Sequence, residues 1–511
     1  DVALLSKAVE SVRRQIYENW ELCIVDDASG KADLSEYLSG LKNDARIRIK
    51  VRTTNGNISA ATNDGIAMAS GQWIAFLDHD DELTSDALFE VAYAINERPD
   101  CDLIYSDQDK VDAEQKYWEP FYKPDWSPVL FCGVMYLGHL LVARKTLVEA
   151  AGGCDSRFDG VQDFELALRM SERTGGIKHI ARVLYHWRAI EGSVAADQNA
   201  KRGIDQLQES AVQAHLNRQN IPATARASRG HRVHLVPAPR TFFPRISILI
   251  PTRDHPELIE RCLKTLFEKT SYPNFEVVIG DNETRNAKAL QVLDSYPVRK
   301  IPLAGEFHFS RFMNLLADEA SGEYLMLLNN DTEIVQKDWL EHLLLFAENP
   351  SVGAAGALLT YEDGTIQHAG IILGPRGTAD HVMRGFPADA DGYMGSLACS
   401  REVSAVTAAA ALVSKKKYRL VGGSCERYRR HYDDLDLCLR LRKRGFRNVS
   451  VSTAHLVHHE SRSRGSKYDY TDRVLLLDRW ESVIEQGDPY YNLNFDRNST
   501  DYRQGISGAS R

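Results

Sequence analysis

Residues 70–83 read SGQWIAFLDHDDEL, a short apolar run that ends abruptly in four carboxylates and one imidazole. A second stretch with the same pattern, SGEYLMLLNNDTEI, occupies residues 321–334. A short continuous apolar run is typical of a strand that is covered on both faces. Each stretch therefore predicts a buried strand with a cluster of polar side chains at its carboxyl end.

The two stretches belong to an internal duplication, because four other blocks recur in the same order. The matched blocks are residues 17–29 with 272–284, 57–65 with 307–315, 160–170 with 431–441, and 183–193 with 455–465. Five matched blocks in one order predict two similar domains, each of ordinary size for a folding unit.

The duplication predicts a first domain over residues 1–225 and a second domain over residues 245–511. Residues 226–244 lie between them, contain several prolines and show little periodicity, which indicates a linker. A proline-rich edge of the first domain is the alternative for the first half of this region.

Within each copy, short apolar strands alternate with helical patterns. RISILIP at residues 245–251 predicts a strand, and Ile259, Leu263 and Leu266 then follow at helical spacing. This alternation predicts an α/β fold with a mostly parallel, doubly wound sheet in each domain. Ligands bind such sheets at the carboxyl ends of the strands, where the acidic clusters lie.

The first copy starts directly in its first predicted helix, DVALLSKAVESV, without a strand that corresponds to residues 245–251. The simpler expectation is that the chain is a fragment, which agrees with Asp1 as the first residue. The alternative is that the first domain completes its sheet in another way.

Composition and charge limit the classes of function. The 511 residues are 43% hydrophobic and 26% charged, which is ordinary for a globular protein. The net charge of −9 argues against nonspecific nucleic-acid binding. The eight cysteines form no C-x-x-C pair, which indicates a reducing compartment and no structural zinc. The sequence shows no signal-peptide pattern and no apolar run long enough to span a bilayer.

The acidic clusters are candidate binding sites. Asp78 and Asp80, two residues apart at a strand end, can hold one hard divalent cation beside a diphosphate. A solvated turn is the alternative, because D-x-D alone is a weak motif. Asp26 and Asp27 end another predicted strand and can bind a base or a ribose, unless they only cap a turn. The recurrence of both clusters in the second copy favours the functional interpretation.

A third acidic position begins a predicted amphipathic helix in each copy, at Asp163 and Asp434. A carboxylate there fits a general base that removes a proton from a sugar hydroxyl. The helix dipole alone would also explain an acidic first turn. His186 and His458 follow in matched blocks and are candidate third metal ligands, with a structural role on an apolar strand as the alternative.

These motifs together resemble the family 2 inverting glycosyltransferases with the GT-A fold, in the tandem arrangement of bacterial polysaccharide synthesis. The resemblance rests on VDDAS, FLDHDD and QDFELALR in the first copy and on GDNET, LNNDTEI, DDLDLCLR and HHESRSRG in the second. It covers nearly the whole chain, and the second copy is similar to a rhamnosyltransferase-like branch. The motifs specify the family far better than they specify the sugar.

The resemblance implies a role for each matching residue. It implies binding of the nucleotide sugar by Asp26, Asp27, Asn63, Asp78, Thr252, Asp281, Glu283, Asn314 and Asn330. It implies binding of Mn²⁺ or Mg²⁺ by Asp78, Asp80, His186, Asp331 and His458. It implies that Asp163 and Asp434 are the catalytic bases, and that the donor is a UDP-, dTDP- or GDP-sugar.

The expected activity is transfer of sugars, with inversion, to a growing glycan or lipid-linked acceptor of the bacterial cell surface, such as O-antigen, capsule or cell-wall glycan. The expected location is the cytoplasm, with peripheral association with the inner membrane or with other polysaccharide-assembly proteins. One departure weakens the second cation site, because Asn329 stands where the first copy has Asp78.

Two other functions are alternatives. A nucleotidyltransferase also builds metal sites from paired aspartates, but it would need a glycine-rich basic loop, and IPTRDHPEL at residues 250–258 is not one. A non-catalytic glycan- or nucleotide-binding scaffold with one or both domains degenerate would explain Asn329 and the missing strand. Retention of Asp163 and Asp434 argues against the scaffold.

Overall fold

The computed structural model of the chain describes residues 1–189, 203–459 and 470–505. The chain forms two compact units, called unit 1 and unit 2 below. Unit 1 consists of residues 1–126, 134–221 and 225–233, and unit 2 of residues 127–133, 222–224 and 234–511. These boundaries differ from the sequence prediction in two respects. Residues 127–133 belong to unit 2, and the expected linker contains strand β10 (Arg232–Pro237), paired with β9 (Ala223–Ser228).

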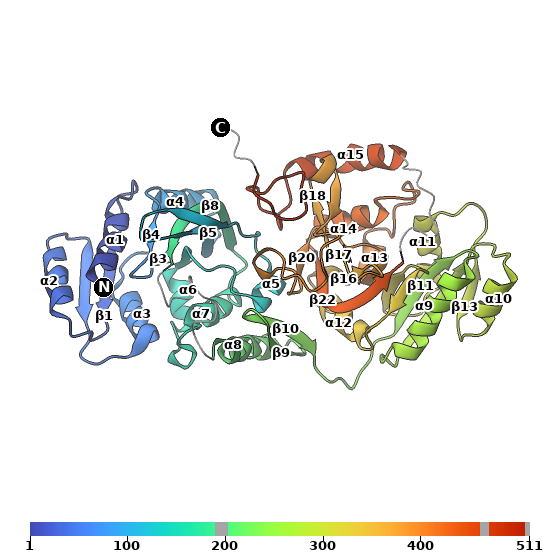
Figure 1. Ribbon diagram of the computed structural model, residues 1–511, viewed down its shortest axis with the longest axis horizontal. Coiled ribbons are helices and arrows are strands. Elements are labelled where there is room, and N and C mark those ends of the chain that lie inside the picture. Colours follow the sequence, from blue (N-terminus) through green and yellow to red (C-terminus); the bar gives the residue numbers. More distant parts are fainter. Residues whose placement is uncertain (190–202, 460–469, 506–511) are drawn as a thin grey trace. The chain divides into compact units, whose positions relative to one another are not determined.

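Helices and strands of unit 1 largely alternate along the chain (Figure 1). They are α1 (Val2–Arg13), β1 (Leu22–Asp26), α2 (Ala32–Leu41), β2 (Ile47–Val51), α3 (Asn57–Met68), β3 (Trp73–Phe76), β4 (Glu82–Leu83), α4 (Ala87–Glu97), β5 (Leu103–Val111), β6 (Tyr117–Phe121), β7 (Leu141–Arg144), α6 (Lys145–Ala151), η1 (Ser156–Phe158), α7 (Gln162–Ser171), β8 (Ile177–Arg188) and α8 (Ile204–Arg218).

Unit 2 has the same plan with additional short strands. Its elements are α5 (Pro128–Gly133), β11 (Ile246–Thr252), α9 (Pro256–Lys269), β12 (Phe275–Asp281), α10 (Ala287–Asp294), β13 (Arg299–Pro302), α11 (Phe309–Glu319), β14 (Tyr324–Leu328), β15 (Thr332–Ile334), α12 (Trp339–Ala347), β16 (Val352–Thr360), β17 (Ile366–His368), β18 (Ile371–Leu373), η2 (Pro375–Gly377), β19 (Ala379–His381), η3 (Tyr393–Gly395), β20 (Arg401–Val403), β21 (Ala410–Ser414), α13 (Lys415–Leu420), α14 (Asp433–Lys443), β22 (Arg447–His458) and α15 (Tyr470–Glu485).

The two units share one strand order. The main sheet of unit 2 runs β13-β12-β11-β14-β21-β16-β22-β15. In unit 1 the corresponding strands form a β1–β2 pair and a separate sheet, β3-β7-β5-β8-β4. In the part of unit 1 that the structure describes, no strand joins this pair to the β3 sheet, whereas β11 makes the corresponding connection in unit 2.

The predicted α/β class is confirmed in both units, but the sheets are less parallel than expected. Strands β11 to β14 are parallel, whereas β21 is antiparallel to both of its neighbours. In unit 1, β7 is likewise antiparallel to β3 and β5, and only β5–β8 is parallel within that sheet. Apolar runs buried on both faces read alike in either direction, so the sequence pattern did not distinguish the two arrangements.

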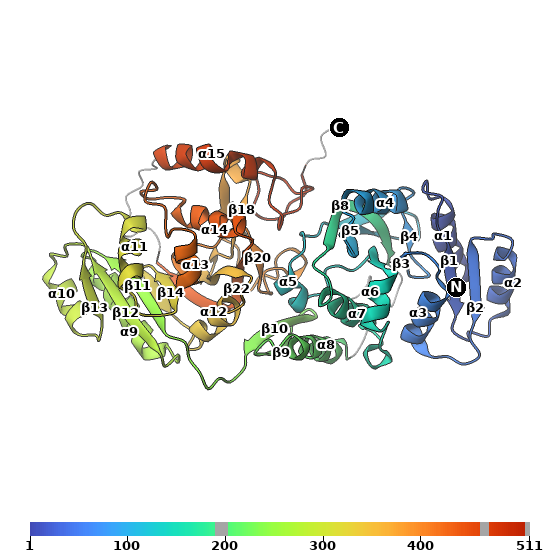
Figure 2. The ribbon, with the colours of Figure 1, turned by 180° about the vertical axis from the view of Figure 1, so that it is seen from behind.

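A buried ion pair recurs at the same place in both units. Glu165 accepts two hydrogen bonds from Arg169 Nε, at 2.7 and 2.9 Å, one turn along α7. Asp436 accepts from Arg440 Nε at 2.7 Å in α14. Both arginines also donate to carbonyls before the helix, among them Gly153 O in unit 1. The pairs hold each helix against the preceding segment, and Figure 2 shows α6 and α7 side by side in unit 1.

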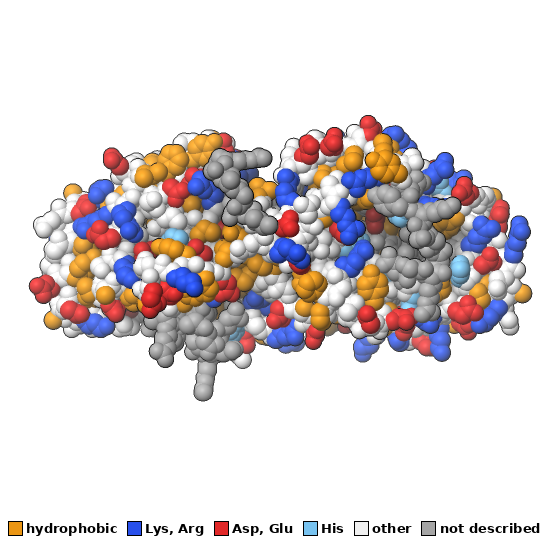
Figure 3. Space-filling model, turned by 45° about the horizontal axis from the view of Figure 1, so that its top comes forward, with side chains coloured by type: hydrophobic (Ala, Val, Ile, Leu, Met, Phe, Trp, Pro, Cys, Tyr) orange, Lys and Arg blue, Asp and Glu red, His pale blue; other side chains and the backbone are white. Residues whose placement is uncertain are grey.

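Two surface properties bear on possible partners. On the face drawn in Figure 3, acidic and basic side chains are interspersed rather than gathered into one large patch of a single sign. Among the described residues, no helix combines the length and the apolar character needed to cross a bilayer.

The buried pair in unit 2 provides a test of stability. Asp436 is fully buried and also accepts from Trp480 Nε1 and Arg479, each at 2.9 Å. We expect Asp436→Ala to destabilise unit 2 by about 3–5 kcal/mol, because Arg440 is left buried without its counter-ion. Denaturant unfolding measures the change. Asp318→Ala, which removes an exposed partner of Arg419, is the matched control and should leave stability unchanged. Equal stability of the two variants would contradict the argument.

Candidate active site

Three side chains of unit 1 converge beyond the end of β3. One ligand atom each from Asp78, Asp81 and His139 lies within 4.8 Å of the others. Asp78 is exposed, His139 is half-buried and Asp81 is buried. Asp78 and Asp81 follow β3. His139 lies in the loop before β7, the strand that pairs with β3, and Leu140 separates it from that strand. Two carboxylates and an imidazole form a set of ligands that suits a divalent cation.

Tyr185 organises this cluster from strand β8. Its hydroxyl donates to Asp81 Oδ2 at 2.5 Å and accepts from the Asp78 backbone N–H at 3.3 Å. Its ring stacks on the His139 imidazole, with centroids 4.6 Å apart. The Arg188 backbone N–H donates to the other Asp81 oxygen at 2.7 Å. Burial raises the pKa of Asp81 to about 8, and the neighbouring Asp78 carboxylate adds to the rise.

Asp163, the predicted base, lies beside this cluster in the first turn of α7. Burial raises the pKa of the Asp163 carboxyl, the nearby His139 imidazole opposes the rise, and the Asp78 carboxylate adds to it. His139 and Asp78 are therefore close enough to influence the charge of Asp163. The structure brings the predicted base together with one predicted cation ligand, Asp78, and with two residues that were not predicted.

His186, predicted as a ligand, lies outside this cluster. Its Nδ1 contacts Asp109 at 2.5 Å, and its ring packs on Tyr117. The register shows the reason: Leu83 pairs with Tyr185 in unit 1, and its counterpart Ile334 pairs with Leu456 in unit 2. The counterpart of His458 is thus residue 187, a tryptophan. The sequence match was shifted by one residue, and such a shift turns a side chain to the opposite face of a strand.

Asp80 is also outside the three-residue cluster. Asp80 Oδ1 lies 3.6 Å from His79 Nδ1, and the Asp80 backbone carbonyl accepts from Arg188 Nε at 2.8 Å. The turn after β3 thus directs Asp81, rather than Asp80, toward His139. The predicted spacing of two residues becomes a spacing of three between Asp78 and Asp81.

The predicted nucleotide ligands of unit 1 lie at the end of β1. Asp26 Oδ1 accepts from the Ser29 N–H at 3.1 Å, and Asp27 accepts from the Gly56 N–H at 2.9 Å. Asp27 also pairs with Arg52 at 2.9 Å. Both carboxylates therefore shape the loops at this strand end, which agrees with the turn-capping alternative and does not by itself assign a ligand.

The corresponding residues of unit 2 form a similar edge. Thr252 and Asp281 are register partners at the ends of β11 and β12, and Asn330 donates to Thr252 Oγ1 at 2.9 Å. Asp281 Oδ1 accepts from the Thr284 N–H at 3.0 Å, which reproduces the turn at Asp26. Glu283 accepts from the Gly305 N–H at 3.2 Å. The structure thus brings Thr252, Asp281 and Asn330 to one edge of the sheet.

Unit 2 has a poorer set of cation ligands than unit 1. His458 Nε2 lies 3.1 Å from Asp331 Oδ1 and 3.4 Å from the Asn329 amide nitrogen. Within the described part of unit 2, no three His, Cys, Asp or Glu ligand atoms lie close enough together to form a cluster. Asp434 lies in the first turn of α14, where its Oδ2 accepts from the Ala408 N–H at 3.3 Å.

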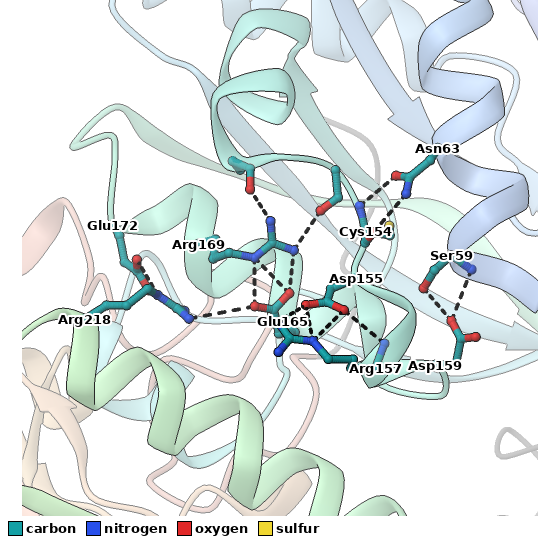
Figure 4. Close-up of polar contacts among 12 residues, drawn as sticks. Ser59, Asn63, Cys154, Asp155, Arg157, Asp159, Glu165, Arg169, Glu172 and Arg218 are labelled. Carbon is teal, nitrogen blue, oxygen red and sulfur yellow. Dashed lines mark hydrogen bonds and ion pairs between the residues drawn. The ribbon is translucent and has the colours of Figure 1, made fainter.

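Asn63 and Asn314 have a different place from the one predicted. The Asn63 amide donates to Cys154 O at 2.8 Å and accepts from Cys154 N–H at 2.7 Å. Asn314 makes the same pair of bonds to Ser424, each at 2.9 Å. Figure 4 shows Asn63 facing Cys154 while Ser59 faces Asp159. In each side-chain amide, the nitrogen and the oxygen both form hydrogen bonds with backbone groups. Asn63 and Asn314 therefore connect α3 and α11 to the segments before α7 and α14, the helices that carry Asp163 and Asp434.

The sequence patterns did not identify Asp81 and His139 as candidate cation ligands. Asp81 was visible within DHDD, but its burial depends on Tyr185 and Arg188, which lie a hundred residues away. His139 had no visible signal, because the second copy carries Ala409 at the corresponding position beside β21. Both residues became ligand candidates only through the pairing of β3 with β7 and of β4 with β8.

Comparison with known proteins now identifies the family. The family model described as "Glycosyl transferase family 2" matches residues 2–141 and 247–385, which is more than half of the chain. The chain belongs to glycosyl transferase family 2. Each of the two matches lies in one copy of the repeat, so this chain carries two family 2 domains.

Two curated relatives match nearly the full chain of this family 2 protein. "O-antigen biosynthesis protein RfbC" of Myxococcus xanthus is 36% identical, over 98% of this chain and 40% of its own length. "Uncharacterized protein y4gI" of Sinorhizobium fredii is also 36% identical, over 98% of this chain and 57% of its own length. The chain thus spans about half the length of these relatives.

Among solved structures, the mannosyltransferase PcManGT from Pyrobaculum calidifontis, in complex with GDP-Man and Mn²⁺, is similar to part of this chain. The match has a TM-score of 0.33 and 15% identity, and it covers 47% of this chain and 70% of that protein.

The raised pKa of Asp81 predicts a pH-dependent stability of unit 1. The folded pKa of about 8 lies above the usual carboxyl value of about 4, so the folded protein keeps a proton that the unfolded chain releases in this window. Without a cation, stability should therefore fall as pH rises from about 4 to about 8. We expect Asp81→Asn to lose less stability over that range, with a melting temperature at least about 2 °C above wild type near pH 8.

Thermal unfolding in EDTA near pH 5 and near pH 8 measures this difference. Asp100→Asn, which changes an exposed aspartate of the same unit, is the control and should follow the wild type at both pH values. Parallel curves for wild type and Asp81→Asn would contradict the assigned burial of Asp81.

Proposed function

We propose that this chain is an inverting, cation-dependent glycosyltransferase that moves sugars from nucleotide-sugar donors to a glycan or lipid-linked acceptor. The observation that carries the proposal is the convergence of Asp163 with Asp78, Asp81 and His139 in a family 2 domain. A base beside a set of cation ligands provides the two functions that the reaction needs, proton removal and stabilisation of a departing diphosphate.

Asp163 removes the proton from the acceptor hydroxyl in this mechanism. The resulting oxygen attacks the anomeric carbon from the side opposite the nucleoside diphosphate, the bond from that carbon to the diphosphate breaks, and the configuration inverts. The raised pKa of Asp163 suits this task, because a more basic carboxylate accepts a proton more readily. His139 lowers that pKa and so helps to keep Asp163 ionised before reaction.

The residues present fit a divalent cation. Asp78 and Asp81 offer hard oxygen ligands, His139 offers a ring nitrogen, and Mn²⁺ accepts this mixture readily while Mg²⁺ prefers oxygen. A cation bound there would neutralise negative charge on the leaving diphosphate. The raised pKa of Asp81 also fits, since a buried carboxylate next to another carboxylate lacks a counter-charge.

In unit 2, Asp434 is the proposed base, and Asp331 and His458 are the proposed contacts of the cation or the diphosphate. The edge formed by Thr252, Asp281 and Asn330 is the proposed nucleotide site, and Asp26 is its counterpart in unit 1. With two sets of residues, the chain either adds two sugars in alternation or makes two successive linkages of one repeat unit.

The proposed product is a bacterial cell-surface polysaccharide. The support is the name of the Myxococcus xanthus relative, an O-antigen biosynthesis protein, together with membership of family 2. The proposed donors are UDP-, dTDP- or GDP-sugars. The proposed location is the cytoplasm, with peripheral association with the inner membrane face or with other assembly proteins.

Replacement of the bases tests the proposed activity. We expect Asp163→Asn to lower sugar transfer by unit 1 about 100-fold or more, because the amide cannot accept the proton. Asp434→Asn should do the same for unit 2. Release of nucleotide from a panel of UDP-, dTDP- and GDP-sugars, with a glycan acceptor and Mn²⁺, measures the rates.

Asp155→Asn is the matched control for unit 1, because Asp155 is an aspartate of the segment before α7 that pairs with Arg157 instead of facing the cluster. Its rate should equal that of the wild type. Turnover that survives in both base variants would contradict the mechanism. No turnover by a folded wild type with any donor would favour the scaffold alternative.

Two histidine variants test the assignment of the cation ligands. We expect His139→Ala to weaken Mn²⁺ binding by unit 1 about tenfold or more, since even groups behind the ligands contribute that much. His186→Ala should leave the affinity within about twofold, because His186 contacts Asp109 and lies outside the cluster. Titration calorimetry with Mn²⁺ on the full chain measures both. The reverse ranking would restore the ligand set predicted from sequence.

A further inference from the structure

A completely buried lysine lies behind His139. Lys123 follows β6, and its side chain has no access to solvent. Its Nζ donates to the carbonyl oxygens of Leu137 and His139, each at 2.6 Å. Lysine is among the residues least often buried, because desolvation of the ammonium group is costly. Its burial therefore calls for an explanation. Both hydrogen bonds of its Nζ are to the loop that carries His139.

The same loop is held from a second direction by Gln108. Its Oε1 accepts from the His139 backbone N–H at 2.9 Å. Gly138, between the two carbonyls, has a φ of +44°, and an added Cβ would lie 2.6 Å from Gln108 Oε1 and 3.7 Å from Lys123 Nζ. The loop is therefore closely enclosed by Lys123 and Gln108, with no room for a side chain at its centre.

The backbone of Lys123 joins a buried polar network. Asp107 Oδ1 accepts from the Lys123 backbone N–H at 2.8 Å and lies 2.8 Å from His179 Nε2. His179 Nδ1 lies 3.1 Å from Asp125, and its ring stacks on Tyr105. The two carboxylate contacts raise the pKa of His179 despite its burial. Lys123 is thus part of a connected polar network that joins β5, β6 and β8 to the His139 loop.

We propose that Lys123 is a positioning residue of the unit 1 active site, which holds the Leu137–His139 loop so that the His139 imidazole faces Asp78, Asp81 and Asp163. The inference rests on the proposed function of that cluster. Lys123 itself touches neither donor nor cation; it acts through the backbone of the residue that does. Groups behind metal ligands affect affinity in this way, by fixing the orientation of the ligand.

Unit 2 anchors the corresponding loop by different chemistry. The residues before β21 occupy the place of residues 137–139, because β21 pairs with β14 as β7 pairs with β3. There the Thr407 N–H donates to Nε2 of His368, a fully buried histidine, at 3.3 Å. The next N–H, of Ala408, donates to the proposed base Asp434. Both units therefore use a buried side chain to hold the loop that faces the base.

Lys123→Met tests the proposal, because methionine keeps the length and volume of the side chain but donates no hydrogen bond. The matched control is Lys145→Met, which removes a 2.6 Å bond from another lysine of unit 1 to a backbone carbonyl, that of Ala69. Two properties of the full chain are measured. Calorimetry gives the Mn²⁺ affinity, and NMR of ¹³C-histidine-labelled protein gives the resonance of His139. That resonance is assigned by its absence in His139→Ala. We expect Lys123→Met to shift this resonance and to weaken Mn²⁺ binding about tenfold.

Lys145→Met should lower thermal stability alone and leave both readouts as in wild type. If Lys123→Met also lowers stability alone, Lys123 is merely structural and the proposal is wrong. If the resonance shifts but wild type and His139→Ala bind Mn²⁺ equally, Lys123 positions His139 and the proposed cation site fails instead. Should Lys123→Met not fold, Gly138→Ala displaces the loop from its other side, and an unchanged His139 resonance in that variant would overturn the proposal.

Discussion

Repulsion among carboxylates is the constraint on which the unit 1 site depends. Asp78, Asp81 and Asp163 come from two chain segments and meet beyond the ends of the strands, with His139 among them. Burial raises the pKa of the Asp81 and Asp163 carboxyls, and the neighbouring Asp78 carboxylate adds to both shifts. Carboxylates held together in this way repel one another, and a cation bound among them would relieve that repulsion.

The scaffold that maintains this arrangement is the same in both units. Buried ion pairs stabilise the positions of α7 and α14. They are Glu165 with Arg169 and Asp436 with Arg440. Asn63 and Asn314 fasten the neighbouring helices to the segments before them through paired backbone bonds. These contacts recur in both units and hold α7 and α14, which carry the proposed bases Asp163 and Asp434. A displacement of about 1 Å of a group that acts as a base can cost a large part of the rate.

The residues at the mouth of the site have diverged much more than the scaffold. Unit 1 has a histidine at residue 139 and a tryptophan at residue 187, whereas unit 2 has Ala409 and His458 at the corresponding places. Unit 1 therefore places His139 at the site from the loop before β7, whereas unit 2 places His458 there from β22. Asn329 in place of Asp78 removes a carboxylate from unit 2, so the two units offer different charge to a cation or a diphosphate.

The sequence by itself determined the duplication, the α/β class and the positions of Asp78, Asp163 and Asp434, because these depend on local patterns that repeat. It did not determine the direction of β7 and β21, since apolar runs buried on both faces read alike in either direction. Nor did it determine the proposed ligands Asp81 and His139, or the place of His186. A ligand set is assembled by strands that are distant in sequence, and a register shift of one residue turns a side chain to the opposite face of a strand. Only the tertiary structure, through the pairing of β3 with β7 and of β4 with β8, decided which side chains meet.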